Sequence, residues 1–246
     1  MTEMTSRCAI VTGASRGIGA AIATRLARDG IAVAVNFSGD PTPAQAVVDA
    51  IGAAGGRAIA VKADVRDPAA VRALFEEAEN AFGGVDILVN NAGIMRLATI
   101  AEADDALFDQ QVAINLKGVF NGLREAATRL REGGRIINFS SSVVGLYPPT
   151  YAIYAATKAA VEAMTHVMSK ELRGRNITVN AIAPGPTATD LFLDGKSREA
   201  IDQLAKQPPL ERLGEPEDIA NAVAFLVGPD GAWINGQVLR ANGGII

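Results

Sequence analysis

Short apolar runs alternate with longer segments of helical periodicity along almost the whole chain of 246 residues. The runs are rich in β-branched residues and apolar on both faces, as strands must be when helices cover both sides of a sheet. The alternation therefore predicts a single α/β domain over residues 1–246, with a doubly wound, seven-stranded parallel sheet flanked by helices. The predicted strands are CAIVT (8–12), IAVAVN (31–36), RAIAVKA (57–63), DILVN (86–90), RIINFS (135–140), ITVNAIA (177–183) and QVLRA (237–241).

Two helices have clear start signals, and one region interrupts the alternation. An Asp-Pro pair opens a helix over 67–82, and a Glu-Pro pair opens another over 215–227. The segment 184–213 has prolines at both ends and an amphipathic middle. It fits a mobile substrate lid beyond the end of a strand, and it fits an ordinary irregular crossover equally well.

Charge and composition argue against several classes of function. A formal net charge of -4 gives no general attraction to phosphate backbones or anionic lipid, so we expect neither nucleic acid nor a membrane as a partner. The N-terminus lacks the features of a secretory signal, which predicts a cytoplasmic protein. Cys8 and His166 are each the only residue of their type and cannot build a zinc site together, so no metal is expected.

The stretch TGASRGIG (12–19) follows the first predicted strand and opens a helix. Gly13, Gly17 and Gly19 allow a sharp turn that brings backbone N–H groups close to a pyrophosphate, whose charge the helix N-terminus favours. The flanking strands and the helix are the context of a dinucleotide site in a Rossmann-type fold. We therefore expect a bound dinucleotide here, and a tight turn without a ligand is the alternative.

The residues after the second strand discriminate between the two nicotinamide cofactors. An acidic side chain there binds the adenosine ribose of NAD, whereas a nearby cation accommodates the extra phosphate of NADP. The chain has Asn36, Phe37 and Ser38 at this place, and the asparagine and serine can donate hydrogen bonds. Arg16, in the glycine turn, can reach the same phosphate with a planar cationic fork. We therefore expect NADP(H), and NAD(H) is the alternative because Asp40 lies nearby.

Five motifs in a fixed order carry a resemblance to a known family. They are TGASRGIG, NNAG (90–93), the serine run at 140–142, YAATK (154–158) and NAIAPGPTATD (180–190). With them the chain resembles the short-chain dehydrogenase/reductase superfamily over essentially its whole length. Within the family it looks most like the 3-oxoacyl-acyl-carrier-protein reductase group and its NADPH-dependent carbonyl-reductase relatives. The resemblance implies reversible reduction of a ketone or 3-oxoacyl compound to a secondary alcohol. An NAD-linked polyol or sugar dehydrogenase and a non-catalytic dinucleotide-binding regulator are the alternatives.

Tyr154 and Lys158 are the expected catalytic acid and its partner. Hydride transfer to a ketone leaves an alkoxide that must be protonated, and an ammonium near a tyrosine lowers the pKa of the phenol. Lys158 lies one helical turn from Tyr154, whereas Tyr151 lies two turns from Lys158, roughly 10 Å along the axis at 1.5 Å per residue. The family signature Tyr-x-x-x-Lys selects the same pair.

The resemblance also assigns a serine and an asparagine. In the family, the serine that polarises the substrate carbonyl usually stands thirteen positions before the tyrosine, which selects Ser141. Alignment on the following VVG would select Ser142 instead. Asn115 matches the asparagine that bends a long helix and holds a water linking Lys158 to solvent.

By the same resemblance, residues from six segments of the chain surround the cofactor. The expected cofactor-binding residues are Gly13, Ser15, Arg16, Gly17, Ile18, Gly19, Asn36, Phe37, Ser38, Asp64, Val65, Asn91, Ala92, Gly93, Tyr154, Lys158, Pro184, Gly185, Thr187 and Thr189.

The residues expected nearest the substrate are mostly apolar, which suggests an apolar or amphipathic carbonyl compound. No dense basic run is present to receive an acidic acyl-carrier protein, so that partner stays open. The expected substrate residues are Met95, Leu146, Tyr147, Tyr151, Leu191 and Phe192.

The C-terminal ANGG (241–244) departs from the VDGG ending usual in the family, and an apolar pair follows it. Exposure of this apolar end to solvent would be unfavourable. Relatives commonly form tetramers through this edge and through the long helices near 105–131 and 151–173. We therefore expect a homotetramer.

Overall fold

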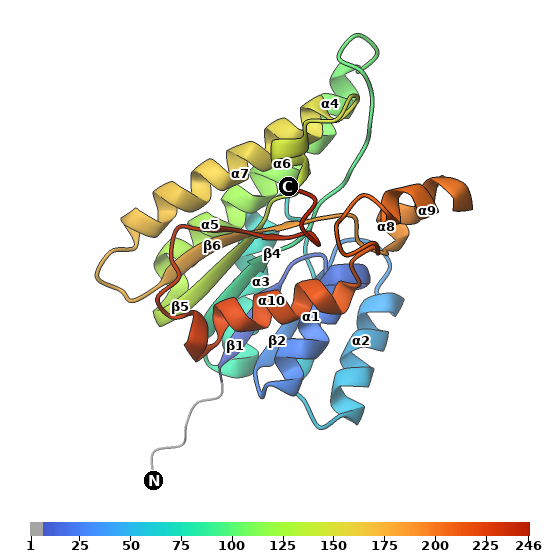
Figure 1. The fold of residues 1–246 in the computed structure, drawn as a ribbon. Helices are drawn as coiled ribbons and strands as arrows, with labels where there is room; N and C mark the ends of the chain where they lie inside the picture. Colours follow the sequence, from blue (N-terminus) through green and yellow to red (C-terminus); the bar gives the residue numbers. More distant parts are fainter. Residues whose placement is uncertain (1–6) are drawn as a thin grey trace.

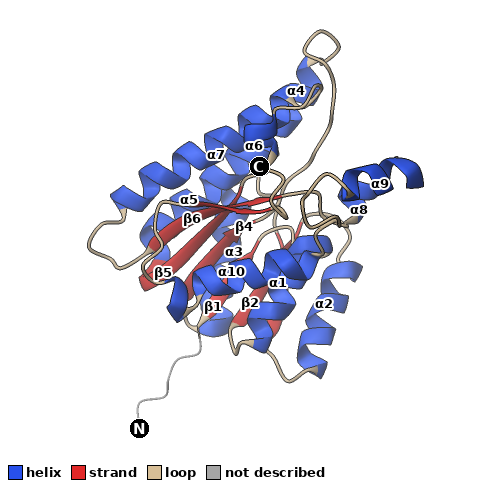
Figure 2. Ribbon diagram, in the orientation of Figure 1, coloured by secondary structure: helices blue, strands red, loops and turns tan. Residues whose placement is uncertain are grey.

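The computed structural model describes residues 7–246, and its centre is a parallel sheet of seven strands in the order β3-β2-β1-β4-β5-β6-β7. Figure 2 shows these strands, in red, between two layers of helices. The predicted fold class is therefore confirmed. The strands are β1 (Cys8–Val11), β2 (Ala32–Phe37), β3 (Ala58–Lys62), β4 (Val85–Asn90), β5 (Leu130–Phe139), β6 (Thr178–Pro184) and β7 (Val238–Ala241).

Helices cover both faces of the sheet, and the strands are apolar on both faces for that reason. In β1, Ala9 and Val11 belong to one hydrophobic core, whereas Cys8 and Ile10 belong to the other. The first core contains residues of α1 (Gly17–Arg28), α2 (Thr42–Ala53) and α10 (Pro216–Val227), and the second contains residues of α3 (Pro68–Phe82), α5 (Gly118–Arg129) and α7 (Ala152–Glu171) (Figure 1).

The two helices with start signals begin as the sequence predicts. The Asp67 carboxylate caps α3 by accepting a hydrogen bond from the Ala69 N–H, and Gly83 ends the helix with a φ of 80°. At α10, Glu215 and Asp218 form a reciprocal capping box. The largest departure is β5, which begins at Leu130, five residues before the predicted start, because an irregular register pairs Leu130 with Val85.

The long helix near 105–131 is not α-helical throughout. It consists of α4 (Asp105–Gln111), a π-helical turn η1 (Val112–Lys117) and α5. Asn115 lies inside the π turn, at the place where the sequence predicts a bend. The irregularity therefore falls on an expected functional residue, as π turns often do.

The segment 184–213 contains two short helices, α8 (Asp190–Leu193) and α9 (Arg198–Ala205). Neither helix buries a residue completely. A short turn α6 (Val143–Leu146) follows β5, and η2 (Pro229–Gly231) follows α10. Within residues 7–246, no helix combines the length and the apolar character that a membrane span requires.

The sheet has a topological switch point at β1, which lies between β2 and β4. The chain crosses to one side of the sheet after β1 and to the other side after β4, so a crevice opens outside the carboxyl ends of these strands. Ligands of doubly wound sheets bind in this crevice.

Candidate active site

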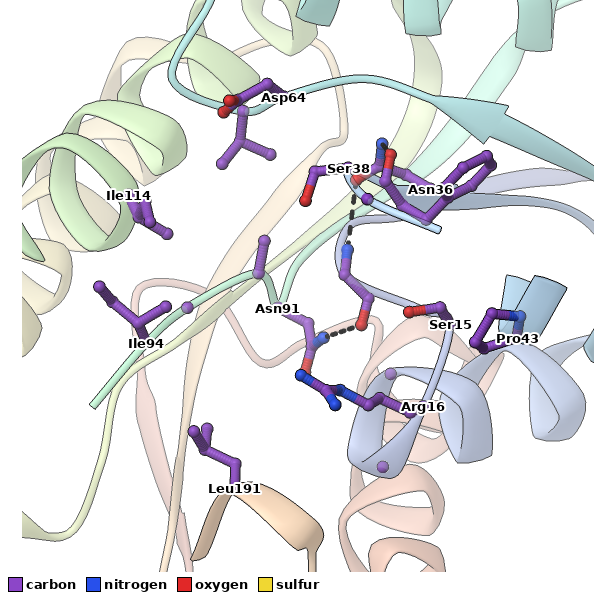
Figure 3. A pocket seen from close by; sticks show the side chains of 18 of the residues that line it. Ser15, Arg16, Asn36, Ser38, Pro43, Asp64, Asn91, Ile94, Ile114 and Leu191 are labelled. Atoms are coloured by element: carbon purple, nitrogen blue, oxygen red, sulfur yellow. Dashed lines mark hydrogen bonds between the residues drawn. The ribbon is translucent and has the colours of Figure 1, made fainter. Parts of the chain in front are cut away.

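The loop after β1 turns sharply at Gly13 and Gly17, whose φ values are 62° and 56°. A side chain at Gly13 would place its Cβ 2.9 Å from the Ala92 Cα, so this close approach requires glycine. Asn91 joins the two loops, because its Nδ2 donates to the carbonyl oxygen of Thr12 at 2.8 Å and to that of Gly13 at 3.0 Å. Figure 3 shows the second of these hydrogen bonds. The glycine turn and the NNAG motif therefore form one cradle at the N-terminus of α1.

A cavity of about 580 Å³ lies over this cradle and the ends of β2, β3 and β4. We call it the cofactor cavity. Its size and the glycine cradle suit a dinucleotide. Of the expected cofactor residues, it is lined by Gly13, Ser15, Arg16, Gly17, Ile18, Gly19, Asn36, Phe37, Ser38, Asp64, Val65, Asn91, Ala92, Gly93 and Thr189. Residues that the sequence did not suggest also line it, among them Pro43, Gln110 and Ile114.

Asn36 differs from the expectation that its side chain donates to a cofactor phosphate. It is 1% exposed, and its Nδ2 donates to the carbonyl oxygens of Ala63, Val61 and Phe37 at 3.0, 3.3 and 3.3 Å. Its Oδ1 accepts the Gly13 N–H at 3.2 Å (Figure 3). The amide therefore braces the glycine turn against β2 and β3, and it has no donor left for a ligand.

Charges of both signs surround the cofactor cavity. The Arg16 side chain is exposed on its wall and makes no hydrogen bond or ion pair with any other residue between 7 and 246 (Figure 3). Asp64 is bound to Arg66 at 2.6 Å, and the Arg66 side-chain hydrogen bond lowers the pKa of its carboxyl. Asp40 also lines the cavity, where the hydrogen bond from the Thr42 backbone lowers its pKa. Arg16 is thus a cation available to an anionic ligand.

Tyr154 and Lys158 lie one turn apart on α7, with the Lys158 Nζ 5.7 Å from the centre of the tyrosine ring. The Nζ donates to the Phe139 carbonyl oxygen at 2.8 Å. Burial lowers the pKa of Lys158 to about 8. Burial also raises the pKa of Tyr154 to about 12, and the side-chain hydrogen bond with Ser141 opposes this rise. The expected lowering of the phenol pKa is therefore absent from this structure, because loss of hydration penalises the charged forms of both groups.

The three consecutive serines have different surroundings. Ser140 donates to the Glu162 carboxylate at 2.6 Å, and Ser142 donates to the Ala183 carbonyl oxygen at 3.1 Å. Ser141 alone forms a side-chain hydrogen bond with Tyr154. Of the two serines that the sequence left open, the structure brings Ser141 to the tyrosine.

Asn115 is fully buried, and its side-chain amide both accepts a hydrogen bond from the backbone of Ile94 and donates one to it. Its Oδ1 accepts the Ile94 N–H at 2.9 Å, and its Nδ2 donates to the Ile94 carbonyl oxygen at 2.9 Å. A Cβ placed on Gly93 would lie 3.3 Å from the Asn115 Oδ1 and 3.7 Å from the Lys158 Nζ. Asn115 therefore fixes the loop that separates it from Lys158, and the proton relay through a water stays a prediction.

A second cavity of about 440 Å³ adjoins the first and shares Ile18, Asn91, Gly93, Ile94, Thr189 and Leu191 with it. We call it the substrate cavity. Tyr154, Lys158, Pro184, Gly185 and Thr187 line this cavity and not the cofactor cavity. Lys158 is the only Lys, Arg, Asp or Glu among its described lining residues. The expected substrate residues Met95, Leu146, Tyr151, Leu191 and Phe192 line it.

The structure does not bring Tyr147, the remaining expected substrate residue, into the lining of this cavity. Its φ of 46° turns the chain at the end of α6, and the residue is 67% exposed and outside the lining of the substrate cavity. Conversely, Leu204 and Gln207 from the region of α9 and Ile245 from the C-terminus line this cavity. The only signal for Ile245 in the sequence was the apolar C-terminal pair.

Residues 7–246 contain no group of three His, Cys, Asp or Glu side chains arranged to hold a metal ion. The site consists of the glycine cradle, the cluster of Ser141, Tyr154 and Lys158, and the largely apolar substrate cavity beside it.

Comparisons with known proteins agree on one family. The family described as enoyl-(acyl carrier protein) reductase matches residues 13–246. A short-chain type dehydrogenase/reductase of Picea abies is 48% identical over 97% of this chain and 92% of its own length. A 3-oxoacyl-[acyl-carrier-protein] reductase of Staphylococcus aureus is 43% identical over 98% of both chains. The crystal structure of a short-chain dehydrogenase from Burkholderia cenocepacia in complex with NADP has a TM-score of 0.92 and is 43% identical over 98% of both chains.

Proposed function

Because the chain belongs to the short-chain dehydrogenase/reductase family and is an NAD(P)-dependent oxidoreductase, we propose that it uses NADPH to reduce an uncharged ketone or 3-oxoacyl compound reversibly to a secondary alcohol. One observation carries the proposal: Tyr154, whose hydroxyl is hydrogen-bonded to Ser141, lines a cavity with a largely apolar wall that adjoins a cavity suited to a dinucleotide. A reducible carbonyl and a proton donor have to meet at such a place.

When bound, the nicotinamide of NADPH supplies the hydride. Tyr154 keeps its proton at neutral pH because its pKa is about 12, so it can protonate the carbonyl oxygen during reduction. Ser141 offers a second hydroxyl to the same oxygen. Lys158, with a pKa of about 8, still carries its proton at neutral pH, and its positive charge favours the phenolate that remains after proton transfer.

The preference for NADPH rests on Arg16 and Ser38, which lie on the wall of the cofactor cavity (Figure 3). β2 ends at Phe37 without a carboxylate, and the relative from Burkholderia cenocepacia was solved with NADP. Arg16→Ala should raise the KM for NADPH roughly tenfold or more, the usual effect of losing a charged hydrogen bond, and should change the KM for NADH little. Equal losses for both cofactors would contradict this role for Arg16.

The test of the function is oxidation of NADPH and NADH against a panel of 3-oxoacyl thioesters, aryl ketones, diketones and ketoses. We expect Tyr154→Phe to lower turnover on the best substrate by roughly a hundredfold or more, the usual contribution of a general acid. Tyr151→Phe is the matched control, because Tyr151 lines the cavity with its ring edge-on to Tyr154. Unchanged turnover in Tyr154→Phe would refute the proposed acid, and a preference for ketoses with NADH would favour a polyol dehydrogenase.

The protein should assemble as a homotetramer. Large apolar side chains are exposed on the expected contact elements: Phe108 on α4, Phe120 on α5, Val167 on α7 and Leu239 on β7. Trp233, in the loop before β7, is 98% exposed, and burial of such a side chain between subunits would be favourable. Light scattering at micromolar concentration should give four times the mass of one chain, and a monomer would contradict the assembly.

A further inference from the structure

The C-terminal residues 242–246 form a turn that contacts three separate parts of the active site. Gly243 and Gly244 have φ values of 65° and 87°, so the chain folds back directly after β7. Figure 1 shows the C-terminus beside α6. We call residues 242–246 the tail turn.

Asn242 attaches the tail turn to Ser142, beside the expected catalytic residue Ser141. Its Nδ2 donates to the Ser142 Oγ at 3.0 Å, and its Oδ1 accepts the Gly244 N–H at 3.0 Å. The Ser142 hydroxyl donates its own hydrogen bond to the Ala183 carbonyl oxygen, so its oxygen can accept the hydrogen bond from the Asn242 amide. Both side chains are buried, and Ser142 is the direct neighbour of Ser141. An aspartate, the residue usual in the family at this place, would have no donor for this hydrogen bond.

Two further contacts determine the course of the tail turn. A Cβ on Gly185 would lie 2.8 Å from the Asn242 Cα, and a Cβ on Gly243 would lie 3.0 Å from the Pro208 Cβ. Beyond this point, Ile246 packs over Gly145, where an added Cβ would lie 2.7 Å from its Cδ1. The turn is therefore held between the loop after β6, the end of the 184–213 segment and α6.

Ile245 is the member of the tail turn that lines the substrate cavity. We infer that the tail turn is a wall of this cavity that limits the size of the ketone, with Ile245 as a specificity-determining residue and Asn242 as the positioning residue that holds it. The inference rests on the proposed function for its substrate class. Its ligand is an uncharged ketone, because Lys158 is the only Lys, Arg, Asp or Glu in the described lining.

The test compares acetophenone with the larger acetonaphthone. Ile245→Ala removes three carbon atoms from the wall, and one methylene in an apolar pocket changes discrimination by roughly tenfold or more. We expect the ratio of kcat/KM for acetonaphthone over acetophenone to rise about tenfold, mainly through KM. Ile246→Ala is the matched control, since Ile246 packs on Gly145 outside the cavity lining. An unchanged ratio in Ile245→Ala, or an equal change in Ile246→Ala, would overturn the inference.

Asn242→Asp tests the positioning role. It should raise the same ratio, and the double variant with Ile245→Ala should show no additional rise, because both changes act on one wall. A variant that only loses stability would lower kcat for both ketones equally and leave the ratio unchanged, which would overturn this role.

Calorimetric binding of the two ketones to the protein with saturating NADP⁺ gives a readout that needs no turnover. The ratio of dissociation constants should shift in Ile245→Ala as the kinetic ratio does. If neither ketone is reduced but this shift occurs, the wall is supported and the proposed function fails. If both ketones are reduced and bound without any shift, the function stands and the wall is refuted.

Discussion

A carboxylate at position 36 should lower the stability of the protein without changing its cofactor preference. A carboxylate at position 38 should change the cofactor preference without lowering the stability. By simple analogy with NAD sites, Asn36→Asp would introduce the acidic residue that binds the adenosine ribose. The structure argues otherwise, because the Asn36 side chain faces inward and its Nδ2 donates to three backbone carbonyl oxygens. Ser38 is exposed at the cavity wall.

The cost follows from the hydrogen bonds of Asn36. Asn36→Asp replaces the donor by an acceptor opposite the carbonyl oxygens of Ala63, Val61 and Phe37, of which Ala63 is the nearest at 3.0 Å. A buried polar group left without its partner costs about 1–3 kcal/mol, so the loss of at least one such pairing plus oxygen–oxygen repulsion gives about 3 kcal/mol. This is a large part of the 5–15 kcal/mol typical of a domain, but it leaves a folded protein.

The loss of stability in Asn36→Asp should depend on pH. Burial beside carbonyl oxygens raises the pKa of the introduced carboxyl above its unfolded value of ~3.9. A group with a raised folded pKa favours the folded state most below the unfolded pKa, and this advantage disappears as pH rises through the folded pKa. The deficit of Asn36→Asp should therefore be larger at pH 8 than at pH 5.

The assay is urea denaturation of the wild type, Asn36→Asp and Ser38→Asp at both pH values, together with KM for NADPH and NADH. Ser38→Asp should keep wild-type stability within about 0.5 kcal/mol, as exposed substitutions usually do, and should favour NADH relative to NADPH. If Asn36→Asp kept wild-type stability and switched the enzyme to NADH, the argument from the inward-facing hydrogen bonds of Asn36 would be refuted.

Three other predictions follow from single residues. Because burial lowers the pKa of Lys158 to about 8, the unfolded chain binds the extra proton between pH 8 and the ordinary value of 10.5, so stability rises with pH in this window. Relative to Lys158→Met, the wild type should gain about 2 kcal/mol between pH 8 and pH 10 in urea denaturation, and parallel profiles would contradict the shift. Gly13→Ala should weaken NADPH binding at least tenfold by calorimetry, because its Cβ would meet Ala92, whereas Gly55→Ala, with a φ of 82° and open space around it, should leave binding unchanged. Tyr147→Ala should alter the KM of the best ketone less than twofold, since Tyr147 lies outside the substrate cavity; an effect as large as that of Met95→Ala would restore it to the substrate site.

The sequence predicted the sheet because strands buried on both faces appear as short runs of apolar residues. In CAIV, for example, successive side chains enter opposite cores. It also brought Tyr154 and Lys158 together, because helical spacing is a local property. It could not show which way Asn36 points, since that depends on carbonyl oxygens of a neighbouring strand. It also could not show that Tyr147 lies outside the cavity lining, because a left-handed backbone turn carries no signal in a tyrosine. Ile245 was missed because its neighbours in space are far away along the chain.

Each hydrogen bond of the π turn η1 spans one residue more than a hydrogen bond of the α-helical segments on either side of it. Deleting one residue within Val112–Lys117 would restore an ordinary α-helical turn and leave α4 close to its present orientation and α5 packed on β4 and β5, because the π turn absorbs that residue. The same deletion inside α5 would rotate its buried face away from the sheet. The chain should therefore tolerate a change in length at this turn better than elsewhere in the helix, and Asn115 occupies the point where such a change would abolish the grip on Ile94.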